Sequence, residues 1–213
     1  MNVALLGATG FVGSALLKEA LDRGYEVTAI VRHPEKLEKR EGLIAKAGDD
    51  YDTSLLATLI QGNDVIISAF NPGWKDQNLY DDQFRGTASI IAAIKKGGIK
   101  RVLWVGGAGE LEVKPGVRVV DSPDLPSWVR PGSLATIDAL DQLGKEPELE
   151  WSYLSLSAEL NSGQRTGKFR LGNDQLLGDA TGKSKISVQD YTVGMIDELE
   201  RPAHVRQRFT AGY

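Results

Sequence analysis

The sequence predicts an α/β fold in which helices cover both faces of a doubly wound parallel sheet. Three observations predict it: short β-branched runs alternate with longer helical patterns, glycines follow the first run at regular spacing, and no repeat divides the 213 residues. This length favours one domain that buries roughly 70% of the surface exposed by its unfolded form. We expect a single domain over 1–213, with its core in 1–106 and the rest of the sheet, loops beside the site and a small C-terminal extension in 107–213.

The expected elements alternate along the chain. Apolar or β-branched runs predict strands at 3–6, 26–31, 43–46, 64–70, 101–105, 151–156 and 206–210, and helical periodicity predicts helices at 11–23, 53–60, 79–96, 134–143 and 188–199. Gly24 stands where a helix-terminating glycine belongs, and Ser187 with Asp190 resembles a capping box. Strands that alternate with helices pair in parallel, so their carboxyl ends meet at one edge of the sheet.

Two segments of the second half are expected to depart from this alternation. Four of the eight prolines lie between residues 107 and 132, which predicts a long loop. The runs 169–171 and 175–177 are separated by Gly-Asn-Asp, which predicts a hairpin.

Composition excludes several kinds of site and partner. The chain has no cysteine, which excludes thiolate nucleophiles and cysteine metal centres, and its two histidines lack metal-ligand spacing, so no metal is expected. A net charge of −4 argues against nucleic acid as a partner. No stretch approaches the roughly 20 apolar residues of a membrane span, and no basic residue precedes Lys18 as in a signal peptide. We therefore expect a cytoplasmic protein that does not bind membranes.

The sharpest local signal is the stretch Gly7-Ala8-Thr9-Gly10-Phe11-Val12-Gly13, which directly follows the first strand and opens a helix. Gly7 allows a tight turn, Gly10 lets the backbone approach a pyrophosphate, and Gly13 lets the helix pack closely on the strand. The helix N-terminus then presents free N–H groups to negative charge. In a first strand–helix–strand unit, this spacing predicts a Rossmann-type dinucleotide site rather than a merely structural turn.

The second and third strands bear on the adenosine half of a dinucleotide. An acidic residue about 20 residues beyond the glycines would bind the ribose of NAD, but the second strand ends Val31-Arg32-His33. Arg32 suits the 2′-phosphate of NADP, with a solvated surface arginine as the alternative. Asp49 follows the third strand, where it either reaches the adenine amino group or forms a turn ahead of a helix.

The fourth strand and the loops beyond it bear on the nicotinamide half. Ser68, Ala69 and Phe70 end this strand and should line the cofactor there, since ligands bind outside the carboxyl ends of such strands. Trp74 and Trp128 lie in expected loops, where they either stack on a planar ligand or anchor the loop. Trp104 and Trp151 lie in strands and are expected in the core.

No catalytic residue is identified. A carbonyl reductase commonly uses a tyrosine whose pKa is lowered by a lysine one helical turn later, but no lysine stands four residues after any of the six tyrosines. Hydride could instead reach an acceptor that takes its proton from water, such as an oxidised flavin. That chemistry needs mainly stacking and close approach.

The chain resembles a group of atypical short-chain dehydrogenases/reductases, the NADH-flavin reductases related to biliverdin-IXβ reductase. The resemblance spans nearly the whole chain and rests on GATGFVG (7–13), VGGAGELEVKPG (105–116), RTGKFRLGNDQLL (165–177) and DYTVGMIDELERPAHVRQRFTAGY (190–213). It implies an NAD(P) domain with phosphate contacts from Gly7, Thr9, Gly10, Phe11 and Val12, and with Arg32 at the adenosine ribose.

The resemblance also places the 106–111 loop, with Gly106 and Gly107, near the nicotinamide. This chain departs from the biliverdin reductases, because Gly-Gly-Ala stands where they have a serine and Ser155-Leu156-Ser157-Ala158 provides no histidine. Bilin reduction is therefore not expected.

Two functions of different classes follow from these residues. The first is an NAD(P)H-dependent oxidoreductase that prefers NADP(H) and transfers hydride to a planar flavin or quinone-like acceptor, with free FMN or FAD as substrate. The alternative is a non-catalytic NADP(H) sensor that acts through a partner protein. A sugar-nucleotide epimerase or dehydratase is disfavoured by the missing Tyr–Lys pair. The sequence leaves the acceptor and the oligomeric state open.

Overall fold

An eight-stranded sheet runs through the protein, whose computed structural model describes residues 1–74 and 76–213. From one edge to the other the strands are β10 (Arg170–Gly172), β12 (Gln207–Gly212), β8 (Glu150–Ser155), β5 (Arg101–Val105), β4 (Val65–Ser68), β1 (Asn2–Leu6), β2 (Glu26–Val31) and β3 (Leu43–Ala47). Neighbouring strands pair in parallel except β10 and β12, which are antiparallel. The predicted doubly wound α/β domain is confirmed.

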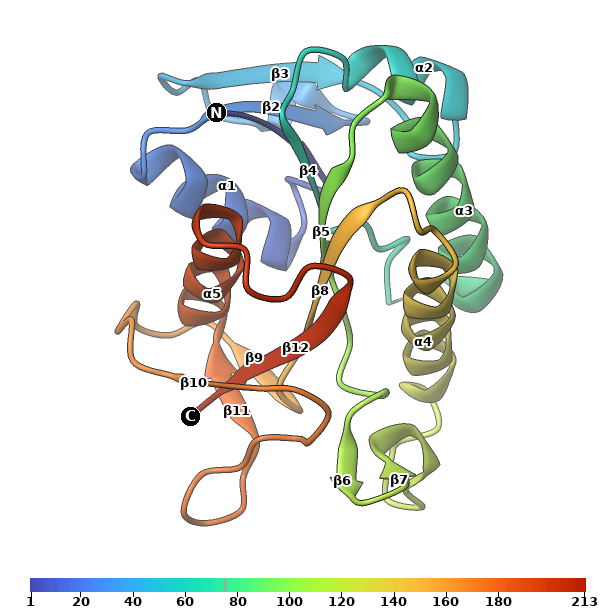
Figure 1. Cartoon of the computed structure of the whole chain (residues 1–213), viewed down its shortest axis with the longest axis vertical. Coiled ribbons are helices and arrows are strands. Elements are labelled where there is room, and N and C mark those ends of the chain that lie inside the picture. Colours follow the sequence, from blue (N-terminus) through green and yellow to red (C-terminus); the bar gives the residue numbers. More distant parts are fainter. Residues whose placement is uncertain (75) are drawn as a thin grey trace.

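Helices cover both faces of this sheet (Figure 1). The longer helices are α1 (Phe11–Asp22), α2 (Thr53–Leu59), α3 (Leu79–Gly97), α4 (Arg130–Gly144) and α5 (Val188–Glu200). Helices α1 and α5 pack side by side on one face, while α3 lies between α2 and α4 on the other. Two apolar clusters result, one under α1 and α5 and one under α2, α3 and α4.

The central strands form because both of their faces are buried. β4 is buried at all four positions and β1 at four of five, which is why their sequences read as continuous apolar runs rather than alternating ones. Each fully buried valine, leucine or isoleucine contributes about 1.5–3 kcal/mol to folding. The register sets Leu6 beside Ile30 and Ser68, and Ser68 beside Trp104. The carboxyl ends of β2, β1, β4 and β5 therefore meet at one edge.

The helix ends follow the predicted signals. Gly24, just beyond α1, has a φ of +80°, a conformation that glycine adopts without strain. The Ser187 side chain accepts a hydrogen bond of 3.0 Å from the backbone N–H of Asp190 and so caps α5.

The predicted hairpin at 169–177 is wrong. Residues 170–172 form β10 and pair with β12 at the sheet edge. The second run turns away because Asp174 accepts a hydrogen bond from the backbone N–H of Glu112, and Gln175 bridges to the same residue. The Gly-Asn-Asp stretch thus connects a run that pairs with β12 to a run that bonds to Glu112, instead of closing a hairpin turn.

The segment 107–132 is less irregular than predicted. It contains a small pair of strands, β6 (Glu112–Lys114) and β7 (Val117–Arg118), and the short 3₁₀ helix η2 (Val119–Asp121). Its last residues already belong to α4. A second small pair joins β9 (Glu159–Asn161) with β11 (Lys185–Ser187), and another 3₁₀ turn, η1 (Pro34–Lys36), follows β2.

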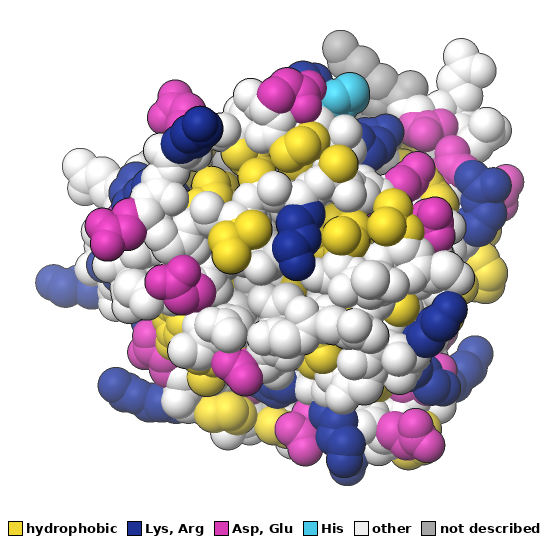
Figure 2. All heavy atoms as spheres, turned by 90° about the horizontal axis from the view of Figure 1, so that it is seen from above, with side chains coloured by type: hydrophobic (Ala, Val, Ile, Leu, Met, Phe, Trp, Pro, Cys, Tyr) yellow, Lys and Arg dark blue, Asp and Glu magenta, His cyan; other side chains and the backbone are white. Residues whose placement is uncertain are grey.

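Strand β3 forms the exposed edge of the sheet. The face of the molecule that is seen from above carries hydrophobic side chains in its middle, with charged side chains of both signs among and around them (Figure 2). Ile44 of β3 is 55% exposed. No helix within 1–74 and 76–213 has the length and apolar character needed to cross a bilayer; a cytoplasmic location stays a prediction.

Candidate functional site

The turn after β1 is built on glycines that no other residue could replace without movement. Gly7 has a φ of +74°, and a Cβ atom on it would lie 2.4 Å from the carbonyl oxygen of Ala69. A Cβ atom on Gly13 would lie 2.0 Å from the carbonyl oxygen of Gly7. Close packing of the turn against β4 and of α1 against the turn therefore requires glycine at both positions.

Helix α1 begins at this turn with an uncapped N-terminus. Gly10 is the N-cap residue, no side chain caps the helix, and its first turn carries no acidic residue. Thr9, Gly10 and Phe11 are exposed and Val12 is half-buried. The first N–H groups of a helix lack partners within the helix, and together with the helix dipole they attract an anion. The cradle thus fits a pyrophosphate, as the glycine spacing predicts.

The expected adenosine side brings Arg32 near the carboxyl group of Asp50. Arg32 is exposed directly after β2. Asp49 is exposed and accepts a hydrogen bond of 3.0 Å from the backbone N–H of Tyr51, so its carboxylate serves the local turn. The neighbouring Asp50 is half-buried, and its Oδ1 atom has no partner among the described residues. Burial and the charge of Asp49 raise the pKa of Asp50 to about 7, against the opposing charge of Arg32.

Sequence reasoning missed Asp50, although the doubled aspartate after β3 was a visible signal. The second strand itself ends without a carboxylate, in Val31-Arg32-His33. The end of β3, however, brings Asp50 close enough for the two charges to interact.

The end of β4 offers backbone rather than side chains to a ligand. Ser68 is fully buried, and its hydroxyl has no partner within the described part of the chain. The ring of Phe70 is also buried, edge-on to Tyr51 at 5.7 Å between centroids and so close to Gly86 that a Cβ atom there would lie 2.3 Å from it. Ala69 meets the turn through its carbonyl oxygen, as described for Gly7.

The loop after β5 packs as closely as the first turn. A Cβ atom on Gly106 would lie 2.1 Å from the Tyr153 ring, and one on Gly107 would lie 2.5 Å from the Thr136 hydroxyl oxygen. Backbone hydrogen bonds from Gly106 to the Leu154 carbonyl and from Leu156 to the Gly107 carbonyl tie this loop to the end of β8. The loop lies at the same edge as Gly7, with β4 between them.

Glu110 of this loop is a second residue that sequence reasoning missed. Its side chain is buried beneath the loop and accepts a hydrogen bond of 2.7 Å from the Ser155 hydroxyl. A single glutamate in a glycine-rich stretch is typical of a surface turn, so only the tertiary packing identifies it.

The tryptophans divide as predicted between core and loops. Trp104 and Trp151 are buried, whereas Trp74 and Trp128 are 54% and 68% exposed. The two exposed rings meet edge-on with 6.2 Å between centroids. A Cβ atom on Gly132 would lie 2.7 Å from Trp74, which places this aromatic pair over the start of α4.

Five of the six tyrosines lack the lowered pKa expected of a proton donor. The pKa is raised in five of the six: by burial first in Tyr25, Tyr51, Tyr153 and Tyr191, and by a hydrogen bond to Asp138 in Tyr80. The hydroxyls of Tyr153 and Tyr191 donate to backbone carbonyls. No cluster of three or more acidic or histidine side chains in 1–74 and 76–213 is arranged to hold a metal ion.

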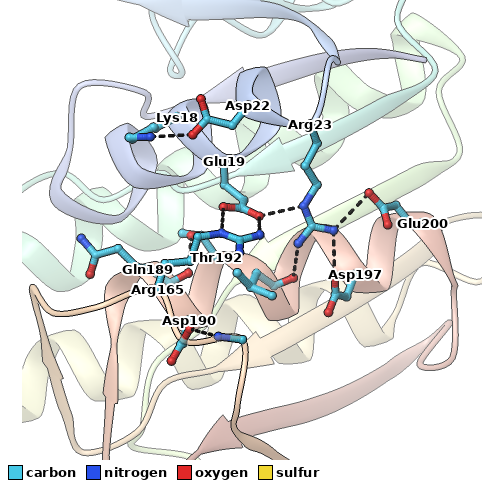
Figure 3. Close-up of polar contacts among 12 residues, drawn as sticks. Lys18, Glu19, Asp22, Arg23, Arg165, Gln189, Asp190, Thr192, Asp197 and Glu200 are labelled. Carbon is cyan, nitrogen blue, oxygen red and sulfur yellow. Dashed lines mark hydrogen bonds and ion pairs between the residues drawn. The ribbon is translucent and has the colours of Figure 1, made fainter.

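The segment that carries RTGKF is attached to α1 and α5 by buried carboxylates (Figure 3). Glu19 of α1 accepts two hydrogen bonds of 2.7–2.8 Å from Arg165 and one of 2.7 Å from Arg23. Asp190 of α5 accepts from the backbone N–H groups of Thr166 and Gly167. These contacts hold residues 165–167 against the helix pair of α1, which begins at the glycine turn, and α5.

The parallel sheet and the glycine turn define a Rossmann-type NAD(P)-binding protein. The sequence model of the NAD(P)H-binding family matches residues 7–199, and the chain belongs to this oxidoreductase-like family. YwnB of Bacillus subtilis, an uncharacterized protein, is 35% identical over 213 residues, which cover 99% of this chain and 97% of YwnB.

Several solved structures align over the whole of this chain, and two of them illustrate the range of descriptions. A protein from Bacteroides thetaiotaomicron, described as a "putative epimerase", is 46% identical with a TM-score of 0.93, and 96% of it is covered. A Streptococcus pneumoniae protein, described as a "putative NADH-flavin reductase", is 30% identical with a TM-score of 0.87 over 99% of its length. The two descriptions name different reactions, so the shared property is the nucleotide-binding fold.

Proposed function

We propose that the protein is a reductase that uses NADPH and passes hydride to a planar acceptor, a flavin or a quinone-like molecule. The glycine cradle at the uncapped start of α1 is the observation that carries the proposal, because it fits a dinucleotide pyrophosphate. Arg32 supports NADP over NAD, since its guanidinium stands exposed where the adenosine ribose should lie. The description of the pneumococcal relative supports a flavin as acceptor.

The bound dinucleotide would supply the hydride, and the chain would supply position. The N–H groups at Phe11 and Val12 would hold the pyrophosphate, while the Gly10 N–H closes the turn on the Gly7 carbonyl and Arg32 would bind the 2′-phosphate. The 106–111 loop would lie under the nicotinamide half. Because five of the six tyrosines have a raised pKa, an acceptor that takes its proton from water suits this chain better than a carbonyl.

The exposed pair Trp74 and Trp128 is the aromatic wall that we propose for the acceptor. Flat rings bind well against an indole face, and these two lie on the α4 side of the loop after β5. Trp128→Ala should raise the KM for the acceptor and leave the Kd for NADPH unchanged.

The direct test follows NADPH absorbance with FMN, FAD, riboflavin and quinones in turn. We expect oxidation above the free-solution rate with at least one acceptor, and a colourless purified protein, because one dinucleotide fingerprint leaves no second site for a tightly held flavin. A yellow protein would contradict the free-flavin form of the proposal. NADPH binding without turnover of any acceptor would contradict the reductase.

Arg32 tests the cofactor preference independently of turnover. A charge-assisted bond to phosphate contributes roughly 1.5–3 kcal/mol, or about ten- to more than a hundredfold in affinity. Arg32→Ala should weaken NADPH binding by about that factor and leave NADH nearly unchanged, with Lys36→Ala and the double variant as controls for a shared role. Equal weakening of NADPH and NADH binding would show that Arg32 does not contact the 2′-phosphate.

A non-catalytic NADP(H) sensor is the second candidate, and the raised pKa of five of the six tyrosines favours it too, since none of these five is prepared to donate a proton. Under either function we expect residues 107–132 to gain order when the cofactor binds, because they follow the strand end where the nicotinamide should lie. Hydrogen exchange with and without NADPH measures this, and unchanged protection would contradict it.

A further inference from the structure

The side chain of Glu110 connects the loop after β5 with the end of β8. Its Oε1 atom accepts hydrogen bonds from the Ser155 hydroxyl at 2.7 Å and from the backbone N–H of Gly107 at 3.3 Å. Ser155 is the last residue of β8, and Gly107 lies just beyond β5. The side chain is only 3% exposed, so this contact is made almost without solvent.

The surroundings of the Glu110 carboxyl do not compensate a negative charge. In 1–74 and 76–213 no lysine, arginine or histidine nitrogen lies within ion-pair distance of it, and its Oε2 atom has no hydrogen-bond partner. Arg208 of β12 donates to the backbone carbonyl of Glu110 at 2.9 Å and pairs with Asp174. Tyr153 of β8 and Tyr191 of α5 are the other titratable groups that face it.

A buried carboxylate without a cation is costly, so such a group remains protonated to a higher pH. Burial accordingly raises the pKa of Glu110, although the hydrogen bonds from Ser155 and Gly107 and the charge of Arg208 oppose this. A protonated carboxyl can still accept both hydrogen bonds through its carbonyl oxygen.

We propose that Glu110 is a positioning residue that acts as an uncharged carboxylic acid, fastening the 106–111 loop to the end of β8 in the shape that receives the cofactor. Ionisation places an unpaired anion under the loop, which loosens the loop and weakens cofactor binding. The link to the cofactor rests on the proposed function, whereas the charge state of Glu110 is a property of the fold alone.

The sign of the pH dependence follows from linkage. A carboxyl whose folded pKa is raised binds more protons in the folded than in the unfolded state. Its stabilising contribution is therefore complete below the unfolded pKa, near 4.5, and is lost as the pH rises through the folded pKa. A single coupled ionisation changes the Kd of a ligand by at most about tenfold per pH unit.

The test compares wild type, Glu110→Gln and Glu110→Ala between pH 5 and 9, measuring urea unfolding and the Kd for NADPH by nucleotide fluorescence. Glutamine keeps an acceptor oxygen and stays uncharged at every pH. We expect Glu110→Gln to match wild type at low pH, and to bind NADPH several-fold more tightly and unfold at higher urea than wild type at high pH. Asp50 and the 2′-phosphate titrate in both proteins, so the difference between the two profiles isolates Glu110.

Glu112→Gln is the matched control, since it removes a half-buried carboxylate two residues away; its profile should run parallel to wild type. Parallel profiles for wild type and Glu110→Gln, or a Glu110→Gln variant as weakened as Glu110→Ala at pH 5, would overturn the proposal. If Glu110→Ala does not fold, the glutamine variant alone decides. Absence of NADPH binding in all proteins would contradict the proposed function, while the unfolding profiles would still decide the charge state.

Discussion

Glu19 and Glu110 are both buried glutamates, 5% and 3% exposed, yet they lie in opposite electrostatic surroundings. Hydrogen bonds from Arg165 lower the pKa of Glu19, against the effect of burial and with help from Arg23. Glu110 has no such partner within 1–74 and 76–213, and burial raises its pKa. Burial alone therefore does not set the charge of a carboxyl group, because a neighbouring guanidinium can reverse its effect.

The two glutamates also do different structural work. Glu19 connects separate pieces of chain, α1 and the segment at Arg165, and the charge supplies the attraction. Glu110 holds neighbouring strand ends under the proposed nicotinamide position, where an uncharged hydrogen bond is sufficient. Three measurements test whether the two glutamates differ in this way.

Glu19→Ala should have the largest effect. It leaves Arg23 and Arg165 facing each other without the carboxylate between them, and removing one partner of a buried pair typically costs 3–5 kcal/mol. Because Arg165 is half-exposed, we expect a loss of about 3 kcal/mol in the free energy of unfolding, measured in urea. Asp22→Ala, which removes an exposed carboxylate from the same helix, should cost less than about 1 kcal/mol. Equal losses would show that the Glu19 charge is not the source of the attraction.

Acid should distinguish the two glutamates next. A carboxyl whose folded pKa is lowered stabilises the protein above its unfolded pKa, near 4.5 for Glu19, and that contribution is lost as the pH falls through the folded pKa. The urea midpoint of wild type should therefore fall more steeply below pH 4.5 than that of Glu19→Gln.

Some loss in acid should remain in Glu19→Gln, because hydrogen bonds, against the effect of burial, also lower the pKa of Asp190 and Glu198. The urea midpoint of Glu110→Gln should fall in acid as steeply as that of wild type. Identical acid profiles for wild type and Glu19→Gln would contradict a charged Glu19.

Asp50 is the intermediate case and should show the smallest effect. Its pKa, raised to about 7 by burial and by Asp49, means that it is mostly charged at pH 8 and mostly neutral at pH 5.5. A partly solvated charge near the proposed 2′-phosphate position repels it by a few tenths to about 1 kcal/mol. Asp50→Asn should therefore tighten NADPH binding about threefold at pH 8, with little change at pH 5.5.

NADH is the control ligand for Asp50→Asn, since it lacks the 2′-phosphate. Fluorescence titrations at fixed ionic strength measure both affinities. An equal change for both cofactors would place Asp50 away from the ribose.

Local signals predicted the fold and half of the candidate site. The glycine turn could be predicted because its requirements, a positive φ at Gly7 and close packing at Gly13, depend on neighbours in one strand–helix unit. Arg32 could be placed at the edge where the strands end because it directly follows β2, a strand whose neighbours in the sheet can be predicted. The binding roles of these residues stay predictions.

The residues that sequence reasoning missed depend on distant parts of the chain. Glu110 is buried only because β8 and α4 close over its loop, and the charge of Asp50 matters only because β3 lies beside β2. The hairpin failed for the same reason: Gly172 and Gln175 find partners in β12 and near Glu112, far away in sequence. The spacing of residues in the sequence shows which residues are neighbours within one strand or helix. It does not show with which distant strand a segment pairs.

The place of β12 in the sheet also sets an order of assembly during synthesis. β12 pairs with β8 on one side and with β10 on the other, so β10 is made first but cannot join the sheet until residues 207–212 have followed. The glycine turn, in contrast, is complete once β4 has been made. A ribosome-bound chain that ends before β12 should therefore present the phosphate cradle on a sheet that ends at β8, with β10 still unpaired.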